Sequence, residues 1–495
     1  MVSLKAFIAE QLTPKTIEAV GLVEPAGPVV SGAPLSARVI PRAEHEISRR
    51  QLSYGALQVL NGLHRAGFQA YLVGGSVRDL LLGREPKDFD VATDARPEQV
   101  RKLFRRNARL IGRRFILAHV QFGEEIIEVA TFRGGSAEQQ DAGERSASGR
   151  ILADNSYGTL EEDALRRDLT ANALYYNIAD RSILDFSTGL EDLRAGRLRM
   201  IGDARTRYSE DPVRMLRAVR FAAKLGFRLD EAAQEPIAEC RSLLAEVPPA
   251  RLFDETLKLF LTGHGLASFE LLRQHGLFAV LFPTIEAALA EDALEPSRRL
   301  LQLALEGTDE RVAAGKSVTP AFLFAALLWP ALQIQCATME STGKPPALAL
   351  QRAAAELLQE ASGRVTVPRR FSLPMREIWD LQARFQRRGG RRPYALLAHP
   401  RFRAAFDFLE LRSRAGEISA ALPQWWLAFQ EADHAARETL VARAREEDRG
   451  QEQELGPLPA SRRRPRRRDR HRGPRHEGAK DQGDTPPSPM DGETG

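Results

Sequence analysis

Two aspartates separated by one phenylalanine, Asp88 and Asp90 in the segment KDFDV, are the residues whose spacing most directly suggests chemistry. In a strand the side chains alternate, so both carboxylates would point to one side while Phe89 turns into the core. Neighbouring carboxylates repel each other, which raises the pKa of one unless cations lie between them. Such oxygen ligands suit Mg²⁺ bound together with substrate phosphates, and a pair of ions can serve an in-line displacement. We therefore expect Asp88 and Asp90 to be catalytic metal ligands.

The glycines that precede this strand, in the segment VGGSVRDLL, suggest a place for phosphate. Gly74 and Gly75 would let the backbone approach a ligand closely, and Ser76 would be the N-cap of the next helix. The first amides of that helix would face phosphate oxygens, and Arg78 could reach the same anion. A glycine pair alone is usually only a turn, and paired aspartates alone occur by chance in edge strands. Their combination in one connected unit favours a nucleotide site.

The segment GGSVRDLLLGREPKDFD closely resembles the head motif of the class II nucleotidyltransferases, which comprise the tRNA CCA-adding enzymes and the bacterial poly(A) polymerases. The resemblance implies that Gly75 and Arg78 bind the nucleotide. It also implies that Asp88 and Asp90 bind metal.

Two further motifs of this family follow in order. RRDLTANAL, residues 166–174, is similar to the family's RRDFTxNA element, with Leu169 in place of the usual phenylalanine. This implies that Arg167 contacts the triphosphate and that Asp168 is the third active-site carboxylate. EDPVRMLRAVRF, residues 210–221, resembles the element that reads the incoming base. The residues to which it assigns base recognition here are Asp211, Arg214 and Arg217.

The residues themselves leave alternatives open at two of these places. Glu128, in the strand-like segment IIEVATF, rivals Asp168 as third carboxylate, although a charge on an edge strand is the simpler interpretation. Asp211 could merely cap a helix and pair with Arg214. A carboxylate and a guanidinium one turn apart also offer an acceptor and donors that match the edge of a nucleobase.

The elements that must position these residues predict an α+β fold. Short apolar segments bounded by turn signals, at residues 68–75, 88–93, 115–122 and 126–132, read as strands. They alternate with amphipathic helical segments, which indicates a head with one small mixed sheet. The family resemblance implies a polymerase-β-like nucleotidyltransferase head. After Gly202 strand signals disappear, and the remaining folded part reads as all-helical.

These patterns divide the chain into five expected regions. They are a flexible leader at 1–50, the head at 51–200, a helical neck with the base-recognition helix at 201–275, a helical body and RNA-binding region at 276–445, and a disordered basic tail at 446–495.

Composition narrows the class of protein. Only two cysteines occur, without a CxxC partner, so a disulfide framework is not expected and a reducing cytoplasm fits. The longest apolar run, residues 320–332, is too short to span a bilayer and reads as a buried helix that ends near Pro330. The segment 461–476 carries a net charge of +8, more than the +5 of the whole chain. The basic character is therefore a property of the tail.

Two features favour the bacterial poly(A) polymerase branch. Residues 110–134 look like a stretch typical of that branch, and the arginine-rich tail also resembles it. Arginine runs neutralise phosphates without reading sequence, which suits an enzyme that holds many unrelated RNA ends. Residues 384–406 mix arginines with Phe385 and Tyr394, which could stack on bases or belong to the core. The arginines expected to bind RNA are Arg387, Arg388, Arg391, Arg392, Arg462, Arg463, Arg464, Arg466, Arg467 and Arg468.

The resulting hypothesis is a template-independent poly(A) polymerase that adds AMP from ATP to RNA 3′ ends, with two Mg²⁺ ions as cofactor. A tRNA CCA-adding enzyme is the nearest alternative, and a non-catalytic RNA-binding adaptor is the second. RNA-degradation proteins are possible partners.

Overall fold

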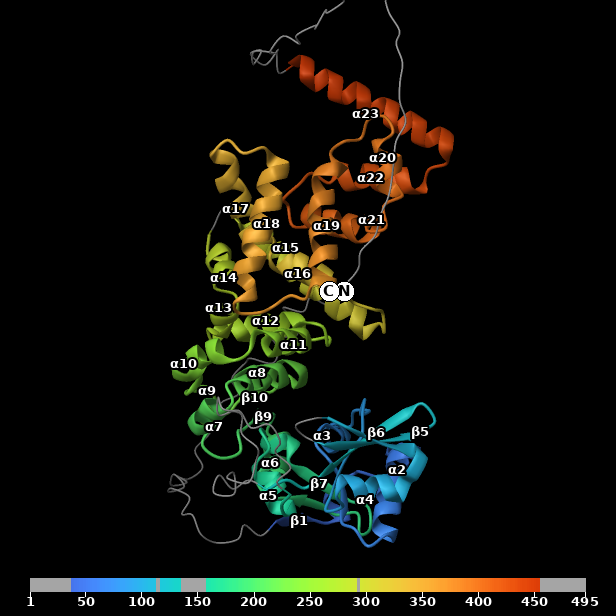
Figure 1. The fold of residues 1–495 in the computed structure, drawn as a ribbon, viewed down its shortest axis with the longest axis vertical. Coiled ribbons are helices and arrows are strands. Elements are labelled where there is room, and N and C mark those ends of the chain that lie inside the picture. The colour runs from blue at the N-terminus through green and yellow to red at the C-terminus, as the bar shows by residue number, and fades with distance from the viewer. Residues whose placement is uncertain (1–36, 113–115, 135–156, 292–293, 455–495) are drawn as a thin grey trace, which may run out of the picture. The chain divides into compact units, whose positions relative to one another are not determined.

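The computed structural model describes residues 37–112, 116–134, 157–291 and 294–454 (Figure 1). The chain forms two compact units. The first comprises Met1–Arg384 with His399–Pro423, and the second comprises Phe385–Ala398 with Gln424–Gly495. All residues of the nucleotide and metal sites expected from the sequence fall in the first unit. The leader before residue 37 and the tail arginines from Arg462 onward lie outside the described residues.

The head is built on one eight-stranded sheet with the order β1-β8-β7-β2-β3-β6-β5-β4. The strands are β1 (Arg38–Ile40), β2 (Ala70–Val73), β3 (Asp90–Thr93), β4 (Ala108–Ile111), β5 (Leu117–Phe122), β6 (Glu125–Thr131), β7 (Leu174–Asn177) and β8 (Ile183–Asp185). Strands β3 and β6 pair in parallel, whereas every other neighbouring pair in this sheet is antiparallel. The expected mixed sheet and the α+β class are confirmed.

The two faces of this sheet are covered differently. Helices α2 (Tyr54–Arg65) and α4 (Pro97–Phe104) pack on one face, where alternate residues of β3, β5 and β6 are buried (Figure 1). On the other face, Ala164 of α5 (Leu160–Leu165) joins a small apolar cluster with Val73, Ala92 and Tyr175. That cluster lies over β2, β3 and β7, near the centre of the sheet.

Two expected boundaries differ from the structure. Strand β1 pairs with β8 at the edge of the sheet, so the head begins before residue 51 and the leader cannot reach residue 50. His45 is buried nearby and its Nε2 lies 2.9 Å from the carbonyl oxygen of Arg181, which fixes the segment that follows β1. At the other end, helix α23 continues to Glu454, past the expected start of the tail at 446.

The head also contains short helices. They are α3 (Gly75–Leu81) and α6 (Gly189–Arg194), with 3-10 turns η1 (Arg42–Glu44), η2 (Arg49–Gln51), η3 (Arg105–Asn107) and η5 (Thr170–Asn172). After the head the chain is mostly helical. The next helices are α7 (Ala204–Glu210), α8 (Val213–Leu225), α9 (Glu231–Gln234), α10 (Ile237–Cys240), η6 (Arg241–Glu246), α11 (Pro249–Phe260) and α12 (Gly265–Gln274). One two-residue strand, β10 (Arg228–Leu229), pairs with β9 (Arg197–Leu198) and is an exception to the expected all-helical region.

The remaining helices of the first unit form a second packed region. They are α13 (Leu277–Leu281), α14 (Pro283–Leu289), α15 (Glu295–Ala313), α16 (Pro320–Leu327), α17 (Trp329–Ser341), α18 (Pro346–Ser362), α19 (Arg369–Phe385) and α21 (Phe402–Arg414). The helix expected to end near Pro330 breaks earlier, at Leu328, because Pro330 belongs to the first turn of α17, where a missing amide hydrogen costs nothing. No helix among the described residues could cross a membrane by itself, and α16 with α17 meets the length and composition of a span only as a pair bent by 52°.

The second unit is small and helical. Its helices are α20 (Arg392–Leu397), most of α22 (Ala421–Glu431) and α23 (His434–Glu454). Aromatic rings hold it together, because Trp426 packs edge-on against Phe385 and donates a 2.9 Å hydrogen bond to the Phe385 carbonyl oxygen.

Candidate active site

The paired aspartates lie where β3 begins. The strand starts at Asp90, and Asp88 lies in the irregular segment just before it, so the expectation that both occupy one strand is wrong. Phe89 is buried, as expected, while Asp90 is partly buried and Asp88 is exposed. The two carboxylates nevertheless act on each other, since Asp88 contributes to the raised pKa of Asp90.

Glu128 lies directly beside Asp90. The parallel pairing of β3 with β6 sets Asp90 opposite Glu128, and β6 is an interior strand between β3 and β5. The interpretation of Glu128 as an edge-strand charge is therefore wrong. Burial, followed by the negative charge of Glu128, raises the pKa of Asp90 to about 6, although Arg167 opposes the change. Three carboxylates thus converge on one end of β3.

The glycine turn lies next to this acidic group. Gly74 has φ +75° and ψ −133°, a conformation that favours glycine, and it is the N-cap of α3. The expectation that Ser76 caps this helix is wrong, because its buried hydroxyl instead donates a 3.1 Å hydrogen bond to the carbonyl oxygen of Val73. A methyl group on Gly74 would lie 3.7 Å from Nη1 of Arg167 and 3.9 Å from Oδ2 of Asp90. The Cα of Gly74 therefore faces both a cation and a carboxylate.

Arg78 is buried next to the glycine turn. Its side chain is only 2% exposed, and its Nε and Nη1 atoms donate hydrogen bonds to Asp79 (2.8 Å) and Asn172 (2.7 Å). A methyl group on Gly75 would lie 3.4 Å from Nη2 of Arg78. In this structure Asp79 and Asn172 hold the Arg78 guanidinium beside Gly75, and its contact with a nucleotide remains a prediction.

Arg167 is held in place by a second network. Its Nε donates to the Tyr175 hydroxyl (2.8 Å) and its Nη2 to Asp163 (3.1 Å), while the Tyr175 hydroxyl donates to the same carboxylate (2.8 Å). Burial raises the pKa of Tyr175, so this hydroxyl keeps its proton as a donor. Nη1 of Arg167, which also donates to the carbonyl oxygen of Asn172 (3.4 Å), lies on the side of Gly74.

Asp168 forms an ion pair with Arg217 and does not join the carboxylates beside Asp90. Its Oδ2 lies 2.6 Å from Nη2 of Arg217, and Asn172 donates to its Oδ1 at 3.5 Å. Burial would raise the pKa of Asp168, but the Arg217 guanidinium outweighs this and the pKa is lowered. Asp168 is therefore a charged, structurally committed carboxylate, and the structure brings Glu128 rather than Asp168 beside Asp90. Asn172, which joins Arg78 to Asp168, was missed from the sequence.

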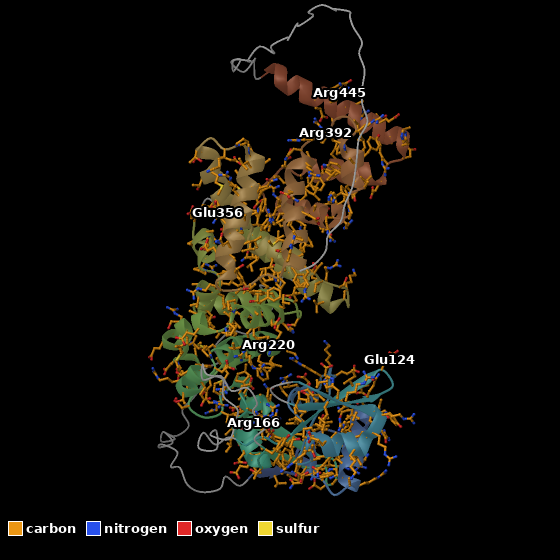
Figure 2. All side chains as sticks on the ribbon, in the orientation of Figure 1. Glu124, Arg166, Arg220, Glu356, Arg392 and Arg445 are labelled. Atoms are coloured by element: carbon orange, nitrogen blue, oxygen red, sulfur yellow. The ribbon has the colours of Figure 1, made fainter. Side chains whose placement is uncertain are left out.

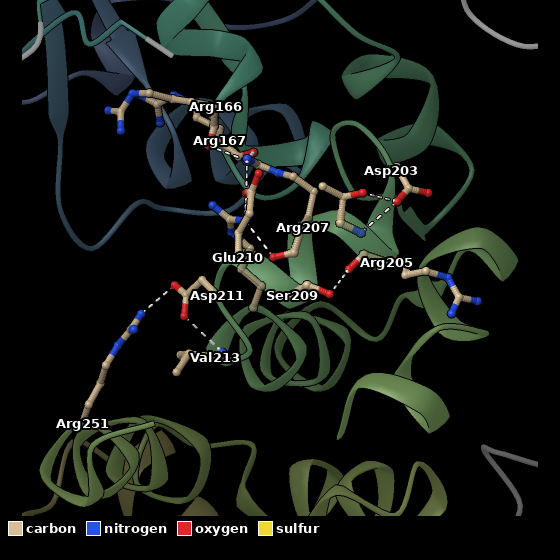
Figure 3. Close-up of polar contacts among 12 residues, drawn as sticks. Arg166, Arg167, Asp203, Arg205, Arg207, Ser209, Glu210, Asp211, Val213 and Arg251 are labelled. Carbon is tan, nitrogen blue, oxygen red and sulfur yellow. Dashed lines mark hydrogen bonds and ion pairs between the residues drawn. The ribbon is translucent and has the colours of Figure 1, made fainter. Parts of the chain in front are cut away.

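Asp211 and Arg214, two of the three residues expected to read the base, each have a partner other than one another. Oδ2 of Asp211 lies 2.6 Å from Nη2 of Arg251 in α11, and its Oδ1 accepts from the amide of Val213 (Figure 3). Arg214 donates to Glu210 at 2.6 Å. The N-cap of α8 is Pro212 rather than Asp211, although Asp211 accepts from the first amide of that helix, and the pair considered between Asp211 and Arg214 is not formed. Nothing near residue 211 in the sequence pointed to Arg251.

Arg207 ties these residues to the RRD segment. Its Nη2 donates to the carbonyl oxygens of Arg166 (2.6 Å) and Arg167 (2.7 Å), and its own carbonyl oxygen accepts from Arg214 at 2.8 Å (Figure 3). Helices α7 and α8 are thereby fixed to the bend after α5 that carries Arg167.

A group of arginines surrounds the ring of Phe221. The guanidinium groups of Arg78, Arg217 and Arg220 lie 5.2, 5.7 and 4.6 Å from its centre. Nε of Arg220, labelled in Figure 2, is buried without a hydrogen-bond partner among the described residues. Burial, followed by the neighbouring Arg217, lowers the pKa of Arg220. Such a concentration of positive charge suits a polyanionic ligand.

The acidic group fits hard cations that arrive with phosphate. No three His, Cys, Asp or Glu side chains within the described ranges form a ready-made metal cage. Mg²⁺ is usually bound through one or two carboxylates together with substrate phosphates rather than by such a cage. Asp88, Asp90 and Glu128 carry oxygen atoms of this type, and repulsion from the other two carboxylates raises the pKa of Asp90, which a cation would offset. The donor set therefore fits Mg²⁺ bound with a nucleotide.

The expected RNA-binding arginines that the structure describes belong to the second unit. Arg387, Arg391 and Arg392 are exposed, while the Arg388 guanidinium lies 5.8 Å from the centre of the Trp425 ring. The two aromatic residues proposed for this region differ. Phe385 is fully buried, so it belongs to the core, whereas Tyr394 is partly exposed and lines a cleft of about 900 Å³ between α20 and α23.

Comparison with known families covers most of the chain. Three family models match: "Poly A polymerase head domain" at residues 70–199, "Probable RNA and SrmB- binding site of polymerase A" at 226–289, and "Polymerase A arginine-rich C-terminus" at 342–471. Their order along the chain is the order of the head, the helices that follow it and the basic C-terminal region.

Individual relatives separate the two branches of the superfamily. The poly(A) polymerase I of Salmonella typhi is 48% identical over 89% of this chain and 93% of its own length. The CCA-adding enzyme of Lactobacillus helveticus is 38% identical over 44% of this chain and 52% of its own length. Among solved structures, a tRNA-processing enzyme in an apo form shares the fold, with a TM-score of 0.54 and 22% identity over 77% of this chain and 98% of that one. The chain belongs to the poly(A) polymerase I family.

Proposed function

We propose that this chain is a template-independent polynucleotide adenylyltransferase that adds AMP from ATP to RNA 3′ ends and releases pyrophosphate. The observation that carries the proposal is the 48% identity to a poly(A) polymerase I over 89% of the chain. The similarity to a CCA-adding enzyme extends over only 44% of the chain. The region that differs between these two comparisons includes the match to the arginine-rich C-terminus.

The residues of the site divide the work of phosphoryl transfer. Asp88, Asp90 and Glu128 would hold Mg²⁺ ions. When bound, the ions would neutralise the charge that develops on the attacking and leaving oxygens. Arg167, at the edge of the Gly74 turn, would bind the triphosphate. Catalysis of this kind consists mainly of positioning and charge neutralisation, for which buried and mutually fixed arginines are suited.

Recognition of the base falls to the start of α8. Asp211 and Arg214 offer an acceptor and donors for the edge of adenine, and Arg217 fixes Asp168 beneath them. Arg251 occupies Oδ2 of Asp211 in this structure, so binding of a base there would exchange one hydrogen-bond partner for another.

The C-terminal part would hold the RNA itself. The exposed arginines of the second unit and the arginines from Arg462 to Arg468 would contact phosphates without reading sequence. The proposal extends to a cytoplasmic enzyme that promotes RNA turnover and contacts RNA-degradation proteins.

A two-substrate assay tests the proposal. The purified chain is incubated with Mg²⁺, either generic RNA or a tRNA that lacks its terminal CCA, and either ATP or CTP. We expect repeated A addition to generic RNA. C addition to the tRNA would identify a CCA-adding enzyme instead, and the absence of pyrophosphate release with every substrate would favour a non-catalytic adaptor. Asp88→Ala and Asp90→Ala should each abolish incorporation while RNA binding persists, and activity in either variant would contradict the metal assignment.

A pair of conservative variants decides between the two candidate third carboxylates. If Glu128 is a metal ligand, Glu128→Gln should lower kcat by at least about 100-fold without loss of thermal stability, since one electrostatic contact to the transition state is typically worth that much. Asp168→Asn should mainly lower stability, because it weakens the pair with Arg217. The opposite result would restore Asp168 to the metal site.

A further inference from the structure

A row of polar side chains crosses half of the head sheet and starts at the active-site carboxylates. The strand registers set Asp90 opposite Glu128, Glu128 opposite His119, and His119 opposite Arg109. Residues that face each other in adjacent strands project from the same face of a sheet. Four consecutive strands, β3, β6, β5 and β4, therefore present these side chains in one line. With three strand spacings between its ends, the row is about 14 Å long.

This half of the sheet face is open. The side chains of Glu128 and His119 are 45% and 32% exposed, with 3.6 Å between Oε2 and Nε2. Arg109, at the edge of the sheet on β4, is exposed, and it forms no ion pair with a residue in the described part of the chain. Glu124, labelled in Figure 2, marks the turn between β5 and β6 at the rim of this surface.

Exposed apolar side chains flank the polar row. Ile126 of β6 is 51% exposed and lies two residues from Glu128, and Ile111 of β4 is 36% exposed and lies two residues from Arg109. Residues two apart in a strand share a face, so both isoleucines lie on the open face of the sheet. A surface with a central charged line and apolar flanks suits a ligand with a charged backbone and flat apolar rings.

The side from which the attacking group approaches indicates which ligand binds this surface, and here the inference rests on the proposed function. In an in-line displacement the attacking and leaving oxygens lie on opposite sides of the phosphorus. The groups suited to the triphosphate, the Gly74 turn and Arg167, lie on the β2 side of Asp90, because Val73 pairs with Asp90. The attacking RNA 3′-hydroxyl must then approach from the other side of Asp90, which is the side of β6, β5 and β4.

We propose that the open face of β6, β5 and β4 binds the 3′-terminal nucleotides of the RNA substrate, with Arg109 on a phosphodiester upstream of the reacting end. His119 lies one strand from Glu128 and would contact the terminal nucleotide, whereas Arg109 is one strand further away. Ile111 and Ile126 would contact bases or sugars without regard to sequence. The role assigned to Arg109 is positioning, because it does not touch the reacting atoms.

The test uses the full chain and compares Arg109→Ala with Arg101→Ala. Arg101 is likewise exposed but lies on α4, which packs against the opposite face of the sheet. We expect Arg109→Ala to raise the KM for a single-stranded RNA primer about tenfold, the value of one charge-assisted contact, with kcat and the KM for ATP unchanged. The slope of log K for RNA binding against log salt should fall by about 0.7, which corresponds to one lost phosphate contact. Arg109→Lys should restore most of the affinity, and Arg101→Ala should change none of these values.

Primers with one uncharged methylphosphonate linkage locate the contact. At one linkage near the 3′ end the replacement should weaken binding to the wild-type protein and to Arg101→Ala, but should cause no further loss in Arg109→Ala. The proposal is overturned if no linkage shows this coupling, or if Arg109→Ala changes kcat alone. The salt slope and the methylphosphonate coupling are measured as RNA binding without turnover, so these two outcomes are independent of the proposed function. Failure of the wild-type protein to extend any RNA would reject the proposed function instead.

Discussion

Replacing Asp90 by asparagine should make the protein more stable while it abolishes activity. The pKa of Asp90 rises to about 6, against an ordinary value of 3.8, and the causes are burial, the charges of Glu128 and Asp88, and only partial compensation by Arg167. An ionised carboxylate in this position therefore opposes folding. Asparagine has almost the same shape and carries no charge, so it removes the penalty.

The size and sign of the effect follow from linkage. A rise from 3.8 to about 6 corresponds to about 3 kcal/mol, which is an upper value because Asp90 keeps some contact with solvent. Between about pH 4 and pH 6 the folded state binds more protons at Asp90 than the unfolded state, so this contribution to stability falls as the pH rises. The advantage of Asp90→Asn should thus be near zero at pH 4, grow through this window and stay constant above about pH 6.

Hydrogen exchange of the β2 and β3 amides, measured without divalent cations from pH 4 to pH 8, is the suitable assay. All tryptophans, from Trp329 onward, lie outside the head, so their fluorescence would report on other parts of the chain. Added Mg²⁺ with a non-reactive nucleotide should stabilise the wild-type protein and leave Asp90→Asn nearly unaffected. Asp88→Asn is the matched control, because its exposed carboxylate should yield less than about 1 kcal/mol.

The reasoning would be refuted if Asp90→Asn were less stable than the wild-type protein at pH 7. A difference that did not change between pH 4 and pH 7 would also refute it, because the gain would then not arise from the ionised carboxylate.

Two further perturbations test the residues that support the site. Gly74→Ala should lower kcat/KM for ATP about 5- to 150-fold, equivalent to roughly 1 to 3 kcal/mol of backbone strain. Gly83→Ala is the control, because Gly83 also has a positive φ but a methyl group there would have no atom within 4 Å; it should leave the KM for ATP unchanged, and equal loss in both variants would contradict a role for the Gly74 turn. Arg217→Met should destabilise the head by about 2 to 4 kcal/mol, because it leaves Asp168 buried without its partner. Asp168→Asn in the same chain should recover part of this loss of stability, measured by thermal unfolding. If the effects of the two substitutions simply add, the pair is not coupled.

Local patterns in the sequence were sufficient for the parts of the site that lie close together in the chain. The strand, glycine turn, short helix and second strand of residues 70–93 are all present, and Phe89 is buried as its position between two aspartates predicts. The start of β3 was misjudged because strand length depends on the partner. Strand β2 ends at Val73, opposite Asp90, and the chain then turns at Gly74, so Asp88 has no strand partner on the β2 side.

Contacts between distant segments could not be predicted in the same way. Glu128 reaches Asp90 only because the chain crosses over through α4, β4 and β5 and returns parallel to β3. Arg251 reaches Asp211 because α11 packs against α8, and neither helix carries a pattern that fixes which polar residues meet. Long-range pairs of this kind have no local signal.

The sequence by itself determined the chemistry available to this protein, since residue type and local periodicity fix the carboxylates, the glycine turn and the basic C-terminal region. Tertiary structure decided which charges meet. Strand register placed Glu128 beside Asp90 and continued the row to Arg109, and helix packing committed Asp168 to Arg217. The physical reason is that electrostatic interactions depend on distances in space, which the order of residues along the chain does not specify.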